Sequence, residues 1–153
     1  ARTEGWEAAL ETYYDEEPDG VEYFYHAGFE QRGDGLPEGL YAVEDKQFRF
    51  RAGSYSGYNA WRNALSLMAT HKPVRYVWDN PQPGPFVELI HFADNEGFIG
   101  PQTCAKLASD FQEWQDRADE YFKTTYHPSY LQTYSEFRRA FELAANGGVV
   151  EFR

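Results

Sequence analysis

Apolar residues recur every three or four positions in several parts of the chain, which is the spacing of one face of a helix. This pattern predicts helices at about 58–70, 101–123 and 129–145, and a shorter one within the acidic segment 1–20. In the helix at 58–70 the apolar stripe consists of Tyr58, Trp61, Leu65 and Met68, and the predicted outer side consists of Asn59, Arg62, Asn63 and Ser66.

Stretches rich in β-branched and aromatic residues predict strands between these helices. They lie at 21–29, 40–43, 47–52, 86–92 and 149–152, and a further short extended piece is predicted at 75–79. Within 47–52 phenylalanine and arginine alternate, which places the two rings on one face and Arg49 and Arg51 on the other. The chain is therefore predicted to be a single α+β domain over residues 1–153, with a small, mainly antiparallel sheet packed against about three helices.

Composition narrows the classes of partner. The formal net charge of −11 repels phosphate backbones, so direct binding of nucleic acid is disfavoured and a basic partner protein is favoured. The alternative is that the acidic charge only keeps the protein soluble.

Aromatic residues make up 18% of the chain, enough to supply both a core and an adhesive surface, so formation of a homo-oligomer is a further possibility. A single cysteine excludes an intrachain disulfide. No apolar run approaches a membrane span, and we expect a cytoplasmic protein.

The stretch 48–62 gathers the most candidate chemistry. A predicted strand runs through a turn bounded by Gly53 and Gly57 into the start of a helix, where unpaired backbone N–H groups can face an anion. Arginines can add charge-assisted hydrogen bonds, and the rings can stack on a base. The candidate ligand-binding residues are Arg49, Arg51, Ser54, Tyr55, Ser56, Tyr58, Trp61 and Arg62.

The same stretch also has a purely structural interpretation. Ser56 or Gly57 would cap the helix, Tyr58 and Trp61 would belong to the core, and the arginines would pair with nearby carboxylates. The segment lacks the lysine and hydroxyl residue of a phosphate-cradling loop, and a glycine-rich turn alone is a weak signal.

A second candidate set is His91, Asp94 and Glu96, which could converge on a divalent metal or act as a general acid and base. Their spacing matches no established metal motif, and residues 94–97 are also typical of an ordinary turn before a helix. No cofactor is predicted, and the sequence favours a binding protein over an enzyme.

Three stretches together resemble an uncharacterised family of small proteins encoded by bacteriophages and prophages. They are 50–58 (FRAGSYSGY) followed by Trp61, then 86–92 (FVELIHF) with 94–101 (DNEGFIGP), and finally 141–144 (FELA) with 148–152 (GVVEF). The resemblance covers about residues 40–153. It implies a phage or prophage setting, in which small acidic accessory proteins often counter host defence. It assigns no catalytic residue.

Three functions follow as hypotheses. The leading one is a phage-type accessory protein in the bacterial cytoplasm that counters host defence by sequestering a small anionic, nucleotide-like ligand at the 49–62 junction. The first alternative is an acidic inhibitor that docks on a basic host protein through 1–20 and the outer face of 101–123. The second alternative is a metal-dependent hydrolase using His91, Asp94 and Glu96.

Overall fold

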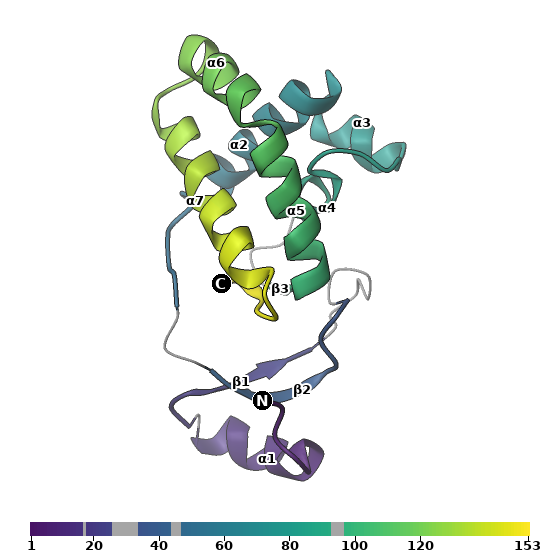
Figure 1. Ribbon diagram of the computed structural model, residues 1–153, viewed down its shortest axis with the longest axis vertical. Helices are drawn as coiled ribbons and strands as arrows, with labels where there is room; N and C mark the ends of the chain where they lie inside the picture. The colour runs from purple at the N-terminus through teal and green to yellow at the C-terminus, as the bar shows by residue number, and fades with distance from the viewer. Residues whose placement is uncertain (17, 26–33, 44–46, 93–96) are drawn as a thin grey trace.

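The computed structural model describes residues 1–16, 18–25, 34–43, 47–92 and 97–153 of the chain. Within these ranges the chain forms a mixed α+β fold (Figure 1). The helices are α1 (Trp6–Glu16), α2 (Tyr55–Thr70), α3 (Val74–Asp79), α4 (Val87–Ile90), α5 (Pro101–Glu113), α6 (Gln115–Thr125) and α7 (Ser129–Ala144). The strands are β1 (Val21–Phe24), β2 (Gly39–Ala42), β3 (Gly97–Ile99) and β4 (Val150–Phe152).

The α+β class is confirmed, but the predicted arrangement was wrong in two respects. The described residues contain seven helices, not about three. Their strands form two separate two-stranded antiparallel sheets, β1–β2 and β3–β4, rather than one sheet. In β1–β2 the register pairs Val21 with Ala42, and in β3–β4 it pairs Gly97 with Phe152. The strands at 40–43 and 149–152 were thus predicted nearly to the residue.

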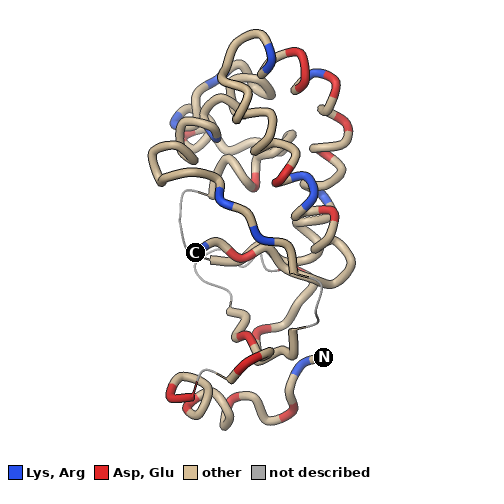
Figure 2. Tube along the Cα trace, turned by 90° about the vertical axis from the view of Figure 1, so that its left-hand side faces the viewer, with Lys and Arg blue, Asp and Glu red and all other residues tan. Residues whose placement is uncertain are grey.

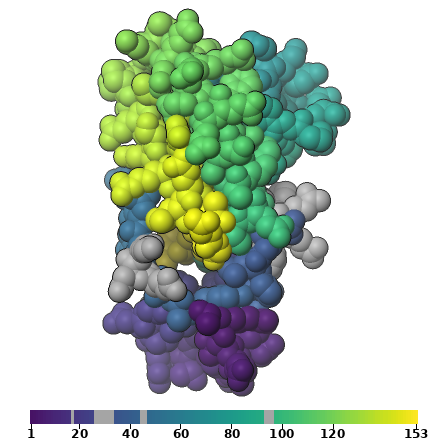
Figure 3. All heavy atoms as spheres, viewed as in Figure 1, coloured from purple at the N-terminus to yellow at the C-terminus, as the bar shows by residue number. Residues whose placement is uncertain are grey.

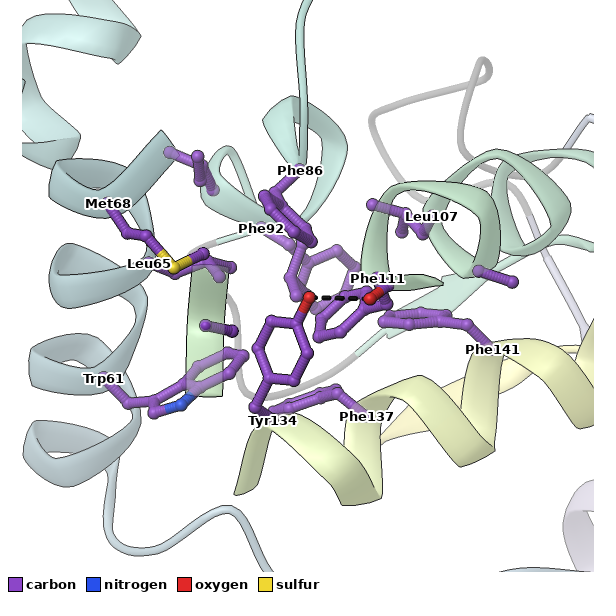
Figure 4. Close-up of a cluster of buried hydrophobic side chains, with 14 of the residues drawn as sticks. Trp61, Leu65, Met68, Phe86, Phe92, Leu107, Phe111, Tyr134, Phe137 and Phe141 are labelled. Atoms are coloured by element: carbon purple, nitrogen blue, oxygen red, sulfur yellow. Dashed lines mark hydrogen bonds between the residues drawn. The ribbon is translucent and has the colours of Figure 1, made fainter. Parts of the chain in front are cut away.

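The core of the helical body lies between α2, α5 and α7 and is built largely of rings (Figure 4). Phe111 of α5 lies 4.6 Å from the ring of Tyr134, and Phe137 lies 4.8 Å from that of Trp61. The buried Tyr134 hydroxyl donates to the carbonyl oxygen of Phe111 at 2.7 Å. That hydrogen bond satisfies the one polar atom of the ring, so the tyrosine can be fully buried at little cost.

Helix α2 begins three residues earlier than its apolar stripe suggested. Ser54 is the N-cap, and its Oγ accepts from the backbone N–H of Gly57 at 3.1 Å, so the predicted caps Ser56 and Gly57 were wrong. The predicted stripe of Tyr58, Trp61, Leu65 and Met68 is buried, as expected. Arg62 and Ser66 were predicted on the outer side but are buried as well, because α3 and α4 cover this side of α2.

Two segments predicted to be extended are helical. Residues 75–79 belong to α3, whose first free N–H, that of Val74, donates to the Asn63 side chain of α2 at 3.0 Å. Residues 86–92, predicted as a strand, contain α4, which begins after Phe86 at a left-handed φ of 60°. The Phe86 N–H donates to Asp110 Oδ2 of α5 at 3.0 Å, which holds this turn in place. A short apolar run fits a buried helix as well as a strand, and here no partner strand lies beside it among the described residues.

Residues 47–52 do not form the predicted strand, because no described strand pairs with them. The predicted alternation of side chains is nevertheless present. Phe48 and Phe50 are half-buried and stack at 5.6 Å, whereas Arg49 and Arg51 are exposed. The alternating pattern therefore predicted correctly which side chains of this segment are buried, but it did not predict that the segment lacks a partner strand among the described residues.

The helix predicted at 101–123 is two helices that meet at Trp114. Pro101 occupies the first turn of α5, as expected. After Trp114 the chain changes direction (Figure 1), and Phe122 of α6 then packs against Tyr130 and Tyr134 of α7, with ring centroids 6.2 Å and 6.1 Å apart. The last helix, predicted at 129–145, matches α7 closely.

Helix α1 and the β1–β2 hairpin form an N-terminal unit at the lower end of an elongated molecule (Figures 1 and 3). The unit is tied together by the antiparallel pairing of β1 with β2 and by the Thr3 N–H, which donates to the Leu40 carbonyl at 2.8 Å. It meets the helical body at β3, where Phe98 packs edge-on against Phe24 and Tyr25, each at 5.3 Å.

Candidate functional site

A cavity of about 470 Å³ opens at the junction between the extended segment 50–53 and the first turns of α2. Its opposite wall is the C-terminal strand β4 with the residue that follows it, and Phe137 of α7 completes the lining. The lining residues are Phe50, Arg51, Ala52, Gly53, Ser54, Tyr55, Tyr58, Phe137, Val150, Glu151, Phe152 and Arg153.

Aromatic rings form the apolar part of this lining. Phe50 packs edge-on against Phe137 at 4.9 Å, and Phe152 lies 6.1 Å from both Phe137 and Tyr58. The Tyr58 hydroxyl is fixed by donating to the Phe92 carbonyl at 3.0 Å. Because the rings hold one another and their polar atom is satisfied, these walls are positioned before any ligand arrives.

Two arginines supply the positive charge of the cavity. Arg51 is exposed and forms no ion pair or hydrogen bond with the described residues. Arg153 is shared between two carboxylates: its Nη2 lies 2.8 Å from Glu151 and 3.1 Å from Glu22 of β1. The hydrogen bond and charge of Glu151, with Glu22 beside it, hold the pKa of Arg153 above its ordinary value. Arg51 is therefore the cation that can approach an incoming anion without first leaving a partner.

The start of α2 adds backbone donors to the same wall. Ser54 satisfies the N–H of Gly57, while the other N–H groups of the first turn lie before the point where intrahelical acceptors begin. Gly53, at φ 102°, adopts a backbone conformation that favours glycine and lets the chain turn sharply into the helix. Tyr55, the first helical residue, is 66% exposed, so its ring is free to cover a ligand.

The structure brings together only part of the predicted ligand set. Arg51, Ser54, Tyr55 and Tyr58 line the cavity. Of the other four, Arg49 is exposed and its Nη2 donates to Gln47 at 3.0 Å, and Ser56 is exposed beside Ser54. Trp61 belongs to the core, where its Nε1 donates to the Tyr130 carbonyl at 3.1 Å.

Arg62 does not line the cavity, and its guanidinium lies against the rings of Trp78 and of Tyr58, which does line it. Arg49 and Arg62 therefore do not join Arg51 in the lining of the cavity. Among the described residues, no ion pair joins any of these three arginines to a carboxylate, and Glu44, Asp45, Asp94 and Glu96 lie outside the described ranges.

Half of the cavity wall was missed by reasoning from the sequence. Phe137 was identified only as a core residue of the last helix, and Glu151 and Arg153 were not singled out. The sequence signal for them is the short alternating segment 150–153, whose apolar and charged residues point to opposite faces of a strand. Nothing local indicates that this strand lies across from residues 50–53.

The proposed metal set lies largely outside the described residues. Asp94 and Glu96 fall in the undescribed range 93–96, and His91 lies at the end of α4 with its Nε2 3.3 Å from the Val77 carbonyl oxygen. Within the described ranges, no group of three or more histidine, cysteine, aspartate or glutamate side chains is arranged to hold a metal ion.

The described helices include none with the length and apolar character needed to cross a membrane. Comparisons of the chain with protein-family models, with curated proteins and with solved structures found no match.

Proposed function

We propose that this chain is a non-enzymatic binding protein that holds a small anionic, nucleotide-like ligand in the cavity between residues 50–58 and β4. The observation that carries the proposal is the combination of aromatic walls with Arg51, which lies just before α2 and has no ion-pair partner among the described residues. Rings offer stacking to any planar base, and a guanidinium beside helix N–H groups offers charge-assisted hydrogen bonds to a phosphate.

The size of the cavity supports a ligand of this class. About 470 Å³ lies within the range of roughly 300–1,000 Å³ that small-molecule sites usually occupy. The rings of Phe50, Phe137 and Phe152 would take the planar part of the ligand. The anionic part would then face Arg51, while Glu151 opposite it would disfavour a second, closely placed negative charge.

A calorimetric titration with a panel of nucleotides and cyclic oligonucleotides tests the proposal. At least one member of the panel should bind the wild-type protein, and Arg51→Gln should weaken that binding by about 10- to 100-fold, the loss of one charge-assisted hydrogen bond. Arg49→Gln is the matched control. It removes the same charge only two residues away, but the Arg49 side chain does not line the cavity. Absence of binding across the panel, or an equal loss in both variants, would refute the proposal.

The biological setting we propose is that of a single-domain phage or prophage accessory protein that acts in the bacterial cytoplasm. By sequestering a nucleotide signal it would counter a host defence system. This part rests on the family resemblance of residues 40–153 and on the acidic charge of −11, which disfavours nucleic acid as the direct target. Co-expression with nucleotide-signalling defence systems should restore phage growth in a manner that Arg51→Gln abolishes.

A second candidate function is an acidic inhibitor, because α1 carries an exposed set of carboxylates. They are Glu7, Glu11, Asp15 and Glu16, with Glu4 and Asp19 on either side. The other acidic face, on α6, lies at the opposite end of the long axis (Figures 1 and 2). A partner that docks on one of these faces therefore does not need the other, and α1 is the first surface to test.

Charge reversal of Glu7 and Glu11 to lysine should abolish capture of such a partner and flatten its steep dependence on salt. The same reversal at Asp116 and Glu120 of α6 is the control, because these residues are equally exposed and lie far from α1. Equal effects of both reversals would show only a non-specific role of net charge.

A further inference from the structure

Arg62 of α2 is a buried cation for which the described residues provide no anion. The residue is only 4% exposed, and its Nε and Nη1 atoms are enclosed without a hydrogen-bond partner. No ion pair with a described carboxylate involves it. A buried charge of this kind is costly unless something completes its hydrogen bonding.

The guanidinium is held by two rings, each of which is itself fixed. Its central carbon lies 5.3 Å from the ring of Trp78 and 5.7 Å from that of Tyr58. Trp78 Nε1 donates to the Ile90 carbonyl at 3.2 Å, and the Tyr58 hydroxyl donates to the Phe92 carbonyl at 3.0 Å. Cation–π contacts orient the group but accept none of its N–H hydrogens, so its donors stay available.

We infer that Arg62 is the receiving group of a second, separate site on the face formed by α2 and α3, and that this site takes a single oxyanion, a phosphate or a carboxylate. Arg62 does not line the cavity proposed for the nucleotide-like ligand, although the Tyr58 ring that it contacts borders that cavity. The inference therefore does not depend on that function.

The geometry of a guanidinium explains how one oxyanion can satisfy it. Each of its two bidentate edges includes Nη2, paired either with Nε or with Nη1. Nε and Nη1 are the two nitrogens of Arg62 that are enclosed without a partner, and Nη2 is not one of them. Nε and Nη1 are closed to solvent, so an oxyanion that reaches Nη2 forms its second hydrogen bond with one of them only after the surrounding side chains move apart.

The surroundings of α3 favour an anion over a cation. Lys72, in the turn before α3, and Arg75, in its first turn, are both exposed. The one exposed carboxylate of this segment is Asp79, at the end of α3. Lys72 is drawn over the ring of Tyr76, 4.9 Å from its centroid. On a chain of net charge −11, the segment 71–79, with two exposed cations and one exposed carboxylate, is locally positive.

Thermal unfolding with inorganic phosphate, at ionic strength matched with sodium chloride, tests the site. Phosphate should raise the melting temperature of the wild type saturably, by at least about 5 °C at a concentration one hundred times Kd. Arg62→Met should abolish the rise, and Arg51→Gln should keep it. Sodium acetate in place of phosphate distinguishes a site for carboxylates from one for phosphates. Two results would overturn the inference. One is a rise in melting temperature that persists in Arg62→Met, and the other is a wild-type rise with phosphate no larger than that with sodium chloride.

A readout in the unaltered protein guards against a variant that does not fold. The arginine Nε–H resonances in a nitrogen–proton spectrum can be followed as phosphate is added. One slowly exchanging, enclosed Nε–H signal should shift and saturate, and Arg62→Lys should remove that signal. If every shifting signal belongs to exposed arginines such as Arg51, phosphate binds elsewhere and the site does not exist. Binding of nucleotides in the cavity does not bear on this outcome.

Discussion

Arg62 carries a charge into a part of the protein where the described residues offer two rings and no carboxylate. Burial lowers the pKa of its guanidinium from its ordinary value, which the nearby Tyr58 phenol only partly opposes. The favourable cation–π contacts, about 0.5–2 kcal/mol each, compete with the desolvation of two donors, about 1–3 kcal/mol each. The balance should favour an apolar side chain whenever no anion is bound.

Arg62→Met should therefore leave the free energy of unfolding in anion-free buffer unchanged or raise it by about 1 kcal/mol, because the unpaired charge is replaced by a flexible apolar chain. Urea denaturation in a chloride-only buffer measures this. Arg138→Met, which breaks the 2.7 Å ion pair with Glu142 on α7, is the control and should lower stability slightly. A loss of roughly 3 kcal/mol or more for Arg62→Met would mean that a carboxylate of the chain pairs with it.

Cys104 gives a prediction about pH. The thiol is fully buried and donates to the Ile99 carbonyl at 3.3 Å, and burial raises its pKa from 9.0 to about 12. The unfolded thiol loses its proton near pH 9, whereas the folded thiol keeps it until about pH 12. Its contribution to stability is thus complete below pH 9 and is lost as the pH rises toward 12, at about 1.4 kcal/mol per pH unit.

Cys104→Ala should reduce the alkaline slope of the free energy of unfolding by about this amount between pH 10 and 11, where the unfolded thiol is ionised and the folded one is not. Urea denaturation at several pH values gives the slope, and a thiol reagent should label the wild type only in denaturant. An unchanged slope, or rapid labelling of the folded protein, would contradict the burial of this thiol.

At the scale of elements, the start of α2 decides the shape of the candidate site. Ser54 and Ser56 have the same side chain and are both exposed, but only Ser54 accepts a backbone hydrogen bond, from Gly57. Ser54→Ala should lower the free energy of unfolding by about 1 kcal/mol, whereas Ser56→Ala should change it by less than about 0.5 kcal/mol. Thermal denaturation of both variants compares them directly. Equal losses of stability would contradict the assignment of Ser54 as the N-cap of α2.

The elements that the sequence predicted well are those whose pattern is local. The stripe from Tyr58 to Met68 and the rings of α7 repeat over several turns, so both helices were found. The two short helices α3 and α4 were misread because their stability comes from partners far along the chain. Asn63 caps α3 and Asp110 fixes the turn before α4, and neither contact leaves a local trace.

The candidate site follows the same division. Its α2 wall, with Arg51, Ser54, Tyr55 and Tyr58, could be predicted because one stretch of chain supplies it. The opposite wall comes from β4, which pairs with β3 some fifty residues earlier in the chain and packs on Phe137 of α7. The burial of Arg62 was unpredictable for a similar reason, since the element that covers it had been taken for an extended segment.

At the scale of the whole molecule, the attachment of the N-terminal unit to the helical body is thin. Besides the rings around Phe98, the attachment includes the exposed ion pair of Arg153 with Glu22, the Gln102 N–H, which donates to the Asp34 carbonyl at 3.2 Å, and the close packing of Gly35 against the Gln102 side chain. Exposed ion pairs contribute little. Phe98 should therefore dominate the attachment: its neighbours on β3, Gly97 and Ile99, face the core, and its ring points to Phe24.

Phe98→Ala should loosen the N-terminal unit without unfolding the helical body. Loss of two edge-on ring contacts, about 0.5–1.5 kcal/mol each, corresponds to roughly 30-fold faster hydrogen exchange in β1 and β2 if the unit opens by itself. Exchange in α5 and α7 should stay as in the wild type. Tyr76→Ala, which truncates an exposed ring on α3, is the control and should change neither region. If Phe98→Ala instead accelerates exchange equally in β1, α5 and α7, the unit and the body unfold together and the chain is one cooperative domain.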